Sequence, residues 1–345
     1  MRIVFMGTPD FSVPSLESLI GSGHQVVAVV TQPDKPKGRG REIQMPPVKE
    51  VALAHQIPVY QPVRARDEAF IAQMRELAPD VMVVIAFGQL LPEELLKVPA
   101  YGCVNIHASL LPRYRGAAPI QWAVINGDQE TGITTMMMEV GMDTGDILEK
   151  LTVKLDEKET GGSLFDRLSV LGGELILSTL AKLEEGTLVR TPQDHEKATY
   201  VKKISKEFGN IDWSREAVAI ERLVRGLNPW PSAYTRCQGK ILKIWEAQVL
   251  ADEEPDAGRL QGQPGIQAEA ADRKEPEMEA EAAGRNEPGL QAACGQILEA
   301  SGDSLKVQTG KGILKINSLQ LEGKKRMDTA AFLRGFKLEA GSVLG

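Results

Sequence analysis

The chain has 345 residues and a formal net charge of −7, with 42% hydrophobic and 25% charged residues. This length favours two domains, the first large enough to bury a sizeable core. The composition excludes a disulfide-stapled secreted domain, because the cysteines at 103, 237 and 294 are few, widely spaced and odd in number. The spacing of His and Cys predicts no metal site. The longest strongly apolar run, 81–87, is too short to cross a bilayer.

The net charge is concentrated in one segment. Residues 251–293 contain eleven acids and four bases, whereas the rest of the chain has 36 of each sign. This segment is rich in Ala, Glu, Gly, Gln and Pro and has no aromatic residue, which predicts a disordered acidic insertion. The balanced remainder can still bind RNA where its bases cluster. The apolar run before Gly7 is too short for a signal peptide, so a cytoplasmic protein without membrane attachment is expected. A monomer is the default expectation for its oligomeric state.

The first part of the chain alternates short apolar runs with helical patterns. The apolar runs are 2–6, 26–30, 81–86 and 102–107, and the helical patterns lie near 11–20, 46–55 and 67–77. A short helix opening at 118–119, a strand at 131–139 and a long helix at 163–184 follow. This order predicts an α/β fold, a mostly parallel doubly wound, Rossmann-like sheet, over 1–185. The loop after the first strand, Gly7 to Asp10, lacks two glycines of G-x-G-x-x-G, so no NAD is expected.

The second part of the chain has a different pattern. Residues 186–208 read as a basic interdomain linker, and 209–345 as a small β-barrel domain. Within it we expect a helix at 217–226, a turn at 228–231 and strands at 239–248, 295–300, 305–308 and 313–320. Such barrels commonly bind nucleic acid, and the bases at 311, 315 and 324–326 favour RNA.

The run from Gly102 to Gly116 begins as a strand and ends as a polar, basic loop. Side chains alternate along a strand, so Asn105 and His107 share a face that Val104 and Ile106 do not. Polar groups on an apolar strand are poor core residues. At the carboxyl end of a parallel strand they would face the crevice in which open α/β sheets bind ligands. The pair is therefore a candidate site.

The chemistry of this pair suits acyl transfer. Asn105 supplies an NH₂ donor and His107 donates or moves a proton, so the two together can stabilise an oxyanion. The glycine-flanked turn at 141–147 can bring Asp143 next to His107, where a carboxylate favours the imidazolium; Asp146 of that turn reads as structural. The nucleophile-elbow pattern G-x-S-x-G does not occur, which argues against an acyl-enzyme. An amine of the substrate would then attack directly.

The block NIHASLLPRYRGAAPI followed by MDTGDI resembles the folate-dependent formyltransferases. MRIVFMGTPDF, TQPDKPKGRG, AFGQLLP, NPWPSAY and LQLEGKKRM also resemble that family, so the resemblance spans nearly the whole chain except the acidic insertion. It implies an OB-like second domain that binds tRNA. It also implies transfer of a formyl group from 10-formyltetrahydrofolate to an amine. Within the family, the sequence most resembles the members that act on methionyl initiator tRNA in translation initiation.

The resemblance also implies roles for individual residues. The catalytic trio falls on Asn105, His107 and Asp143. The residues implied in folate binding are Ser109, Leu110, Leu111, Pro112, Phe87, Gly88, Gln89, Leu90 and Leu91. The segment from 34 to 41 has four bases against one acid, and in the family this loop engages the acceptor end of the tRNA. Its bases, which are implied in tRNA binding, are Lys35, Lys37, Arg39 and Arg41.

Three other functions are open to test. A formyltransferase for a small-molecule amine, such as glycinamide ribonucleotide or an amino sugar, would share the trio but would not need the basic loop or the second domain. A nicotinamide-dependent dehydrogenase is disfavoured by the missing glycines of the first loop. A non-catalytic RNA-binding module would leave the trio without a purpose.

Overall fold

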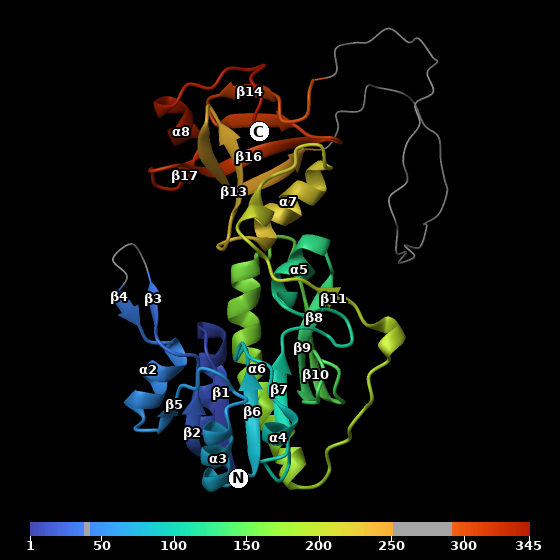
Figure 1. Ribbon diagram of the computed structural model, residues 1–345. Helices are drawn as coiled ribbons and strands as arrows, with labels where there is room; N and C mark the ends of the chain where they lie inside the picture. Colours follow the sequence, from blue (N-terminus) through green and yellow to red (C-terminus); the bar gives the residue numbers. More distant parts are fainter. Residues whose placement is uncertain (38–41, 251–291) are drawn as a thin grey trace, which may run out of the picture.

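A computed structural model describes residues 1–37, 42–250 and 292–345. Two sheets, each with its own helices, follow one another along the chain (Figure 1). The predicted acidic insertion, up to residue 291, lies outside the described residues. None of the described helices combines the length and the apolarity that a membrane crossing requires.

The first sheet has the strand order β10-β9-β7-β6-β1-β2-β5. Its strands are β1 (Arg2–Gly7), β2 (Gln25–Val30), β5 (Val59–Tyr60), β6 (Val81–Ile85), β7 (Cys103–His107), β9 (Glu130–Met137) and β10 (Ile147–Lys154). Neighbours from β7 to β5 are parallel, whereas β9 runs antiparallel to both β7 and β10. The predicted mostly parallel sheet is confirmed. The edge strand β10 was not predicted, although its buried and exposed residues alternate as in a half-buried strand.

Helices cover both faces of this sheet. Alternation along β1 places Ile3 and Phe5 in one core and Val4 and Met6 in the other. The first core is closed by α1 (Val13–Ile20, after a short 3₁₀ turn at Asp10–Ser12), α2 (Pro47–Ala54) and α6 (Gly161–Glu184). The second is closed by α3 (Glu68–Leu77) and α4 (Glu93–Leu96). A Cβ on Gly173 of α6 would lie 3.1 Å from the backbone of α1, so glycine permits this close helix packing.

Two small strand pairs flank the first sheet. β3 (Lys35–Lys37) and β4 (Glu42–Gln44) form an antiparallel hairpin within the predicted basic loop. The predicted segment 34–41 is therefore partly strand, and its tip at 38–41 lies outside the described residues. β8 (Arg115–Gly116) pairs in parallel with β11 (Tyr200–Val201) of the linker. Short 3₁₀ turns at His195–Lys197 and Glu207–Gly209 flank β11.

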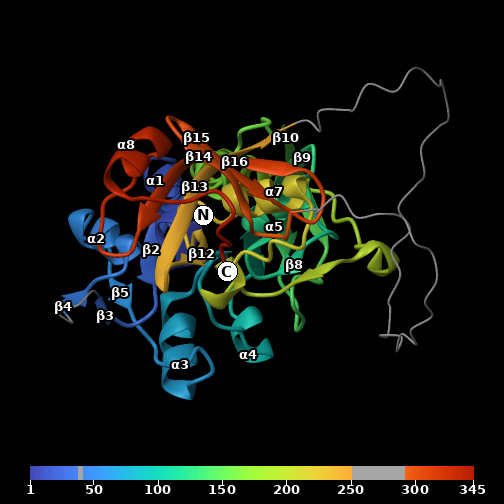
Figure 2. The same cartoon turned by 90° about the horizontal axis from the view of Figure 1, so that it is seen from above.

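The second sheet is antiparallel, with the order β12-β13-β16-β15-β14 and β17 beside β16. Its strands are β12 (Ala233–Cys237), β13 (Lys240–Leu250), β14 (Ile297–Ser301), β15 (Ser304–Gln308), β16 (Ile313–Leu321) and β17 (Met327–Asp328). The helices α7 (Ala217–Gly226) and α8 (Thr329–Gly335) belong to it. α7 also packs against α5 (Pro119–Asn126), whose Ile125 joins the second core (Figures 1 and 2). The predicted fold class, a parallel sheet followed by a small β domain, is confirmed.

Candidate active site

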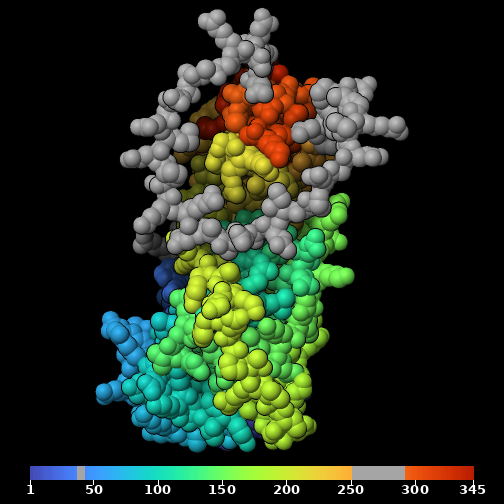
Figure 3. Space-filling model, turned by 90° about the vertical axis from the view of Figure 1, so that its right-hand side faces the viewer, coloured from blue at the N-terminus to red at the C-terminus, as the bar shows by residue number. Residues whose placement is uncertain are grey.

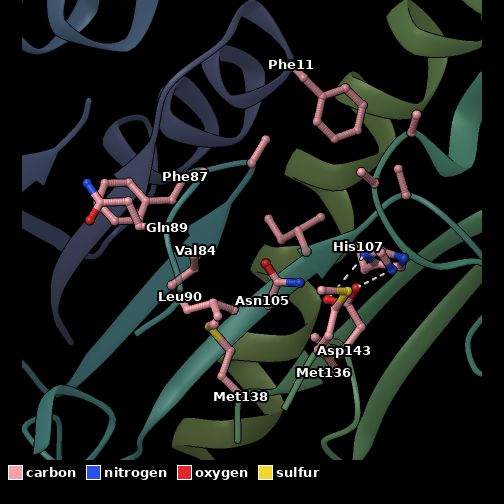
Figure 4. Close-up of a pocket in the computed structure, with 18 of the residues that line it drawn as sticks. Phe11, Val84, Phe87, Gln89, Leu90, Asn105, His107, Met136, Met138 and Asp143 are labelled. Atoms are coloured by element: carbon pink, nitrogen blue, oxygen red, sulfur yellow. Dashed lines mark hydrogen bonds and ion pairs between the residues drawn. The ribbon is translucent and has the colours of Figure 1, made fainter. Parts of the chain in front are cut away.

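A cavity lies at the carboxyl ends of β1, β6 and β7, and the strand order changes direction between β1 and β6. β1 has β2 on one side and β6 on the other, which makes this edge a topological switch point. The cavity has a volume of about 640 Å³ and contains Pro9 after β1, Phe87 after β6, and Asn105 and His107 of β7. Its walls are mainly apolar (Figure 4). A cavity of this size and composition is typical of a small-molecule site.

Asn105 presents a free amide to this cavity. The residue is only 9% exposed, and among the described residues its side chain has no hydrogen-bond partner. Figure 4 shows the amide nitrogen on the side that faces Asp143. The amide is accessible from the cavity, so its N–H is available to donate a hydrogen bond to a ligand.

His107 lies on the same face of β7 and is held from both sides. Its Nε2 lies 2.9 Å from the carbonyl oxygen of Tyr114, and its Nδ1 lies 3.7 Å from Oδ1 of Asp143. A carbonyl only accepts, so Nε2 carries the hydrogen of this bond. Nδ1 is therefore the ring atom left to take or give a proton. The separation of 3.7 Å exceeds a hydrogen bond, so the contact with Asp143 is an ion pair when the ring is protonated.

Asp143 is fixed by a neighbouring peptide group. Its φ of +55° lies in the left-handed region, which is rare for residues other than glycine. One carboxylate oxygen, Oδ2, accepts a hydrogen bond of 2.7 Å from the amide of Gly116, which leaves Oδ1 to face His107. The structure thus brings the three predicted residues Asn105, His107 and Asp143 to one cavity.

Cys103 shares the face of β7 with the pair but is not available for chemistry. The residue is 1% exposed, and burial raises the pKa of its thiol to about 12. A thiol of this pKa is protonated at neutral pH and is a poor nucleophile. Cys103 is therefore a buried hydrophobic residue of the core that β7 shares with α3 and α4.

The predicted folate-binding segment after β6 lies only partly at the cavity. Phe87, Gly88, Gln89 and Leu90 line it, with Leu90 77% exposed at the rim. The side chain of Gln89 points away (Figure 4): its Oε1 accepts a 2.7 Å bond from the amide of residue 65. Leu91 does not line this cavity, because it is buried in the core beneath α3 and α4.

The predicted folate-binding residues Ser109, Leu110, Leu111 and Pro112 are not among those that line this cavity, and their role in folate binding stays a prediction. Leu111 is fully buried against β9 and β10. The hydroxyl of Ser109 donates to the carbonyl of Arg113 at 2.7 Å, which closes the loop on itself. The family motif places these residues next to His107 in sequence, but the chain turns away from the cavity after Ala108. In this structure they support the loop that carries Tyr114.

The apolar walls of the cavity were not identified from the sequence. They come from several distant elements: Phe11, Val84, Ile106, Ile120, Met136, Met138 and Phe165. Apolar residues of this kind look the same in a core and in a binding site, so no sequence signal marks them. The peptide groups of Tyr114 and Gly116 were also missed, since backbone contacts leave no trace in side-chain patterns.

The basic hairpin is anchored at its base. Asp34 accepts hydrogen bonds from Lys49 Nζ and Gln61 Nε2, both at 2.7 Å, and the Lys49 bond lowers the pKa of the Asp34 carboxyl. Lys35 is exposed on β3, whereas the side chain of Lys37 and all of Arg39 and Arg41 lie outside the described residues. Figure 1 shows the hairpin extending toward the end of the molecule that carries the second sheet.

Comparison with known proteins gives matches over both parts of the chain. The family model described as "Formyl transferase" matches residues 1–180, and that described as "Formyl transferase, C-terminal domain" matches residues 203–337. A protein of Agathobacter rectalis named methionyl-tRNA formyltransferase is 52% identical over 342 residues, covering 99% of each chain. One of Clostridioides difficile with the same name is 45% identical over 345 residues, covering all of both chains.

Similarity extends to solved structures. The crystal structure of an N-formyltransferase from Helicobacter canadensis, in complex with folinic acid and dTDP-3-aminofucose, has a TM-score of 0.62 to this chain. The match covers 92% of this chain and 98% of that one, at 15% sequence identity. At this identity the likeness concerns the fold alone.

Proposed function

The chain belongs to the formyl transferase family, and from this membership we propose that it transfers the formyl group of 10-formyltetrahydrofolate to the α-amine of methionyl initiator tRNA. It is a formyl-transferring enzyme, and its substrate is the one that the names of its relatives state. A folate-derived donor is supported by the family and by the folinic acid in the Helicobacter canadensis structure. The reaction would supply formylated initiator tRNA for protein synthesis.

The observation that carries this proposal is the unpaired amide of Asn105 beside His107 and Asp143. Acyl transfer to an amine passes through a tetrahedral intermediate whose oxygen bears negative charge. The amide N–H of Asn105 and a protonated Nδ1 of His107 are donors on the same cavity wall. The carboxylate of Asp143 stabilises that protonated ring by its charge.

The proposed reaction balances without a covalent enzyme intermediate. The neutral α-amine attacks the formyl carbon, so a new C–N bond forms and the carbonyl electron pair moves to oxygen. Collapse of this intermediate breaks the bond to N10 of the folate. The attacking nitrogen loses a proton and N10 gains one, and the His107–Asp143 pair is the group placed to relay it.

The cavity suits the flat ring system of a folate. Phe87 and Gly88 form one side, and the φ values of +47° at Ala86 and +87° at Gly88 bend the chain there so that the backbone faces the cavity. No atom lies within 4 Å of a Cβ built on Gly88 in the part of the chain that is described, so this edge is open to a ligand. We assign pterin binding to Phe87, Gly88 and Leu90 with the backbone of Gln89.

A formylation assay with purified components tests the proposed function. Methionyl initiator tRNA and 10-formyltetrahydrofolate are expected to give formylmethionyl-tRNA with turnover. Glycinamide ribonucleotide and a nucleotide-linked amino sugar, at the same concentration, are expected to give none. Efficient formylation of a small amine, with none of the tRNA, would instead establish the small-molecule reaction.

We propose that the basic hairpin binds the acceptor end of the tRNA, with contributions from the second domain. Replacing Lys37, Arg39 and Arg41 together by alanine is expected to raise the KM for tRNA with little change in the KM for the folate. The plot of log kcat/KM against log salt should also become less steep, by about 0.7 to 0.9 for each phosphate that the variant no longer neutralises.

A charge-matched control for this variant is the triple alanine replacement of Arg75, Lys97 and Arg190. These exposed bases lie on α3, directly after α4 and in the linker. This control is expected to retain the wild-type KM and salt dependence. Equal effects of the two triple variants would mean that the hairpin acts only through net charge.

A further inference from the structure

The linker between the two sheets contacts the turn that carries Asp143. Its backbone runs along the outside of the first domain (Figures 1 and 3), yet Gln193 is only 6% exposed. Gln193 is hydrogen-bonded to Arg115 of β8, which is itself only 1% exposed. A segment that only tethers two domains has no reason to bury polar side chains, because burial costs free energy unless each polar atom is paired.

Gln193 holds the turn that carries Asp143. Its Nε2 donates to the carbonyl oxygens of Asp143 at 2.8 Å and Gly145 at 2.7 Å. Its Oε1 accepts from Arg115, at 2.7 Å from Nη2 and 3.1 Å from Nε. Because carbonyls only accept and guanidinium only donates, the orientation of this amide is unambiguous. The bonds fix both sides of a residue whose positive φ needs such support.

Arg115 is held by the linker rather than by an acid. Among the described residues it has no ion-pair partner. Besides Gln193, its Nη1 donates to the hydroxyl of Tyr200 at 3.0 Å, and both terminal nitrogens lie 3.3 Å from Nδ1 of His195. All of these partners belong to the linker. A buried arginine is ordinarily paired with a carboxylate, so this arrangement ties the linker firmly to β8.

The linker also holds the two peptide groups that orient the catalytic pair. The hydroxyl oxygen of Thr199 accepts from the amide of Tyr114 at 2.8 Å, and the carbonyl of Thr199 accepts from the amide of Arg115 at 2.8 Å. The carbonyl of Tyr114 in turn accepts the Nε2 hydrogen of His107. The pairing of β11 with β8 fixes Gly116, whose amide donates to Asp143.

We propose that Gln193 and Thr199 of the linker, with Arg115, are positioning residues for Asp143 and His107. This inference rests on the proposed function, since it assigns these residues a part in the formyl transfer. It goes beyond it in making the linker a component of the active site. The linker then affects kcat only indirectly. It holds Asp143 and His107 in place and does not itself contact a reacting atom.

Gln193→Glu tests this proposal. Glutamate keeps the size of the side chain and an acceptor for Arg115, but replaces the NH₂ group that binds two carbonyls with an oxygen. We expect kcat to fall by about ten- to a hundredfold, the order of loss for a misplaced catalytic group. The KM values for methionyl-tRNA and 10-formyltetrahydrofolate should stay within about twofold. Glu196→Gln, on an exposed residue of the same segment, is the control and should retain wild-type kinetics.

A double-mutant cycle distinguishes positioning from general damage. If Gln193 acts through Asp143, Gln193→Glu should lower kcat in the wild-type background but have little further effect in Asp143→Asn. The same factor in both backgrounds would overturn the proposal. Should Gln193→Glu fail to fold, Thr199→Val removes one hydroxyl from an exposed residue and is expected to lower kcat several-fold through Tyr114, which holds His107. Wild-type kcat in the folded variants would also overturn it.

The two hypotheses fail in different ways. If Asp143→Asn lowers kcat but Gln193→Glu has the wild-type kcat, only the proposed role of the linker is excluded. A normal Asp143→Asn would remove the assigned catalytic site itself, and with it the reason to position Asp143.

Discussion

Asn105→Ala is expected to lower kcat for formyl transfer by at least about a hundredfold, as the loss of an oxyanion donor does. The side chain is directed into the cavity and makes no hydrogen bond to another described residue, so truncation removes a contact to the reaction and none to the fold. The KM for methionyl-tRNA should change little, because the amide binds the oxygen most strongly when it is charged. Steady-state kinetics together with a thermal unfolding curve check this expectation.

Asn105→Asp provides the second arm of this experiment. Aspartate has nearly the same shape but replaces the donor with a negatively charged acceptor. It should therefore be at least as slow as the alanine variant, since it repels the developing oxyanion. If either variant turns over at near the wild-type rate, Asn105 is not the donor and the cavity needs another assignment.

Asp143→Asn is expected to lower kcat by a similar factor, at least about a hundredfold. The amide oxygen of asparagine can still accept the hydrogen bond from Gly116, so the turn is expected to keep its conformation. What is lost is the negative charge that faces Nδ1 of His107 at 3.7 Å. Without it the protonated ring is less stable, and both oxyanion stabilisation and proton relay weaken.

Asp146→Asn is a matched control for this variant. Asp146 lies three residues further along the same turn, and the same change removes the same charge. Its side chain does not line the cavity, so kcat is expected to stay within about threefold of wild type. A comparable loss in both variants would mean that the turn acts by its overall charge, and a normal Asp143→Asn would exclude the ion pair from the mechanism.

Local patterns were sufficient to predict part of the site. Strand alternation placed Asn105 and His107 on one face of β7, and the glycine-rich turn was expected to bring Asp143 to them. The folate-binding role of the segment Ser109–Pro112 stays a prediction from the family resemblance. Its buried Leu111 packs against β9 and β10, and its residues are not among those that line the cavity.

The helices and strands were predicted best where hydrophobic residues recur with a regular helical or strand spacing. The helix at 217–226 was predicted with the boundaries that α7 has in the structure, and β1, β2, β6 and β7 within about a residue. β10, β12 and the β3–β4 hairpin were missed as strands. Their pairing depends on partners across a turn or at a sheet edge, and such strands carry weak patterns of their own.

By itself the sequence determined the layered α/β fold, the β domain that follows it and the family, because periodicity and short motifs are local properties. It also predicted the three residues Asn105, His107 and Asp143, which the structure brings to one cavity. Only the tertiary structure decided which groups orient that trio. Gln193 meets Asp143 across 50 residues, and Arg115 meets Gln193 across 78. Hydrogen bonds over such separations depend on how whole elements pack, and nothing in the residues near either end specifies them. The sequence therefore predicted residues 186–208 only as an interdomain linker. In the structure this linker contacts Asp143 and the loop that holds His107.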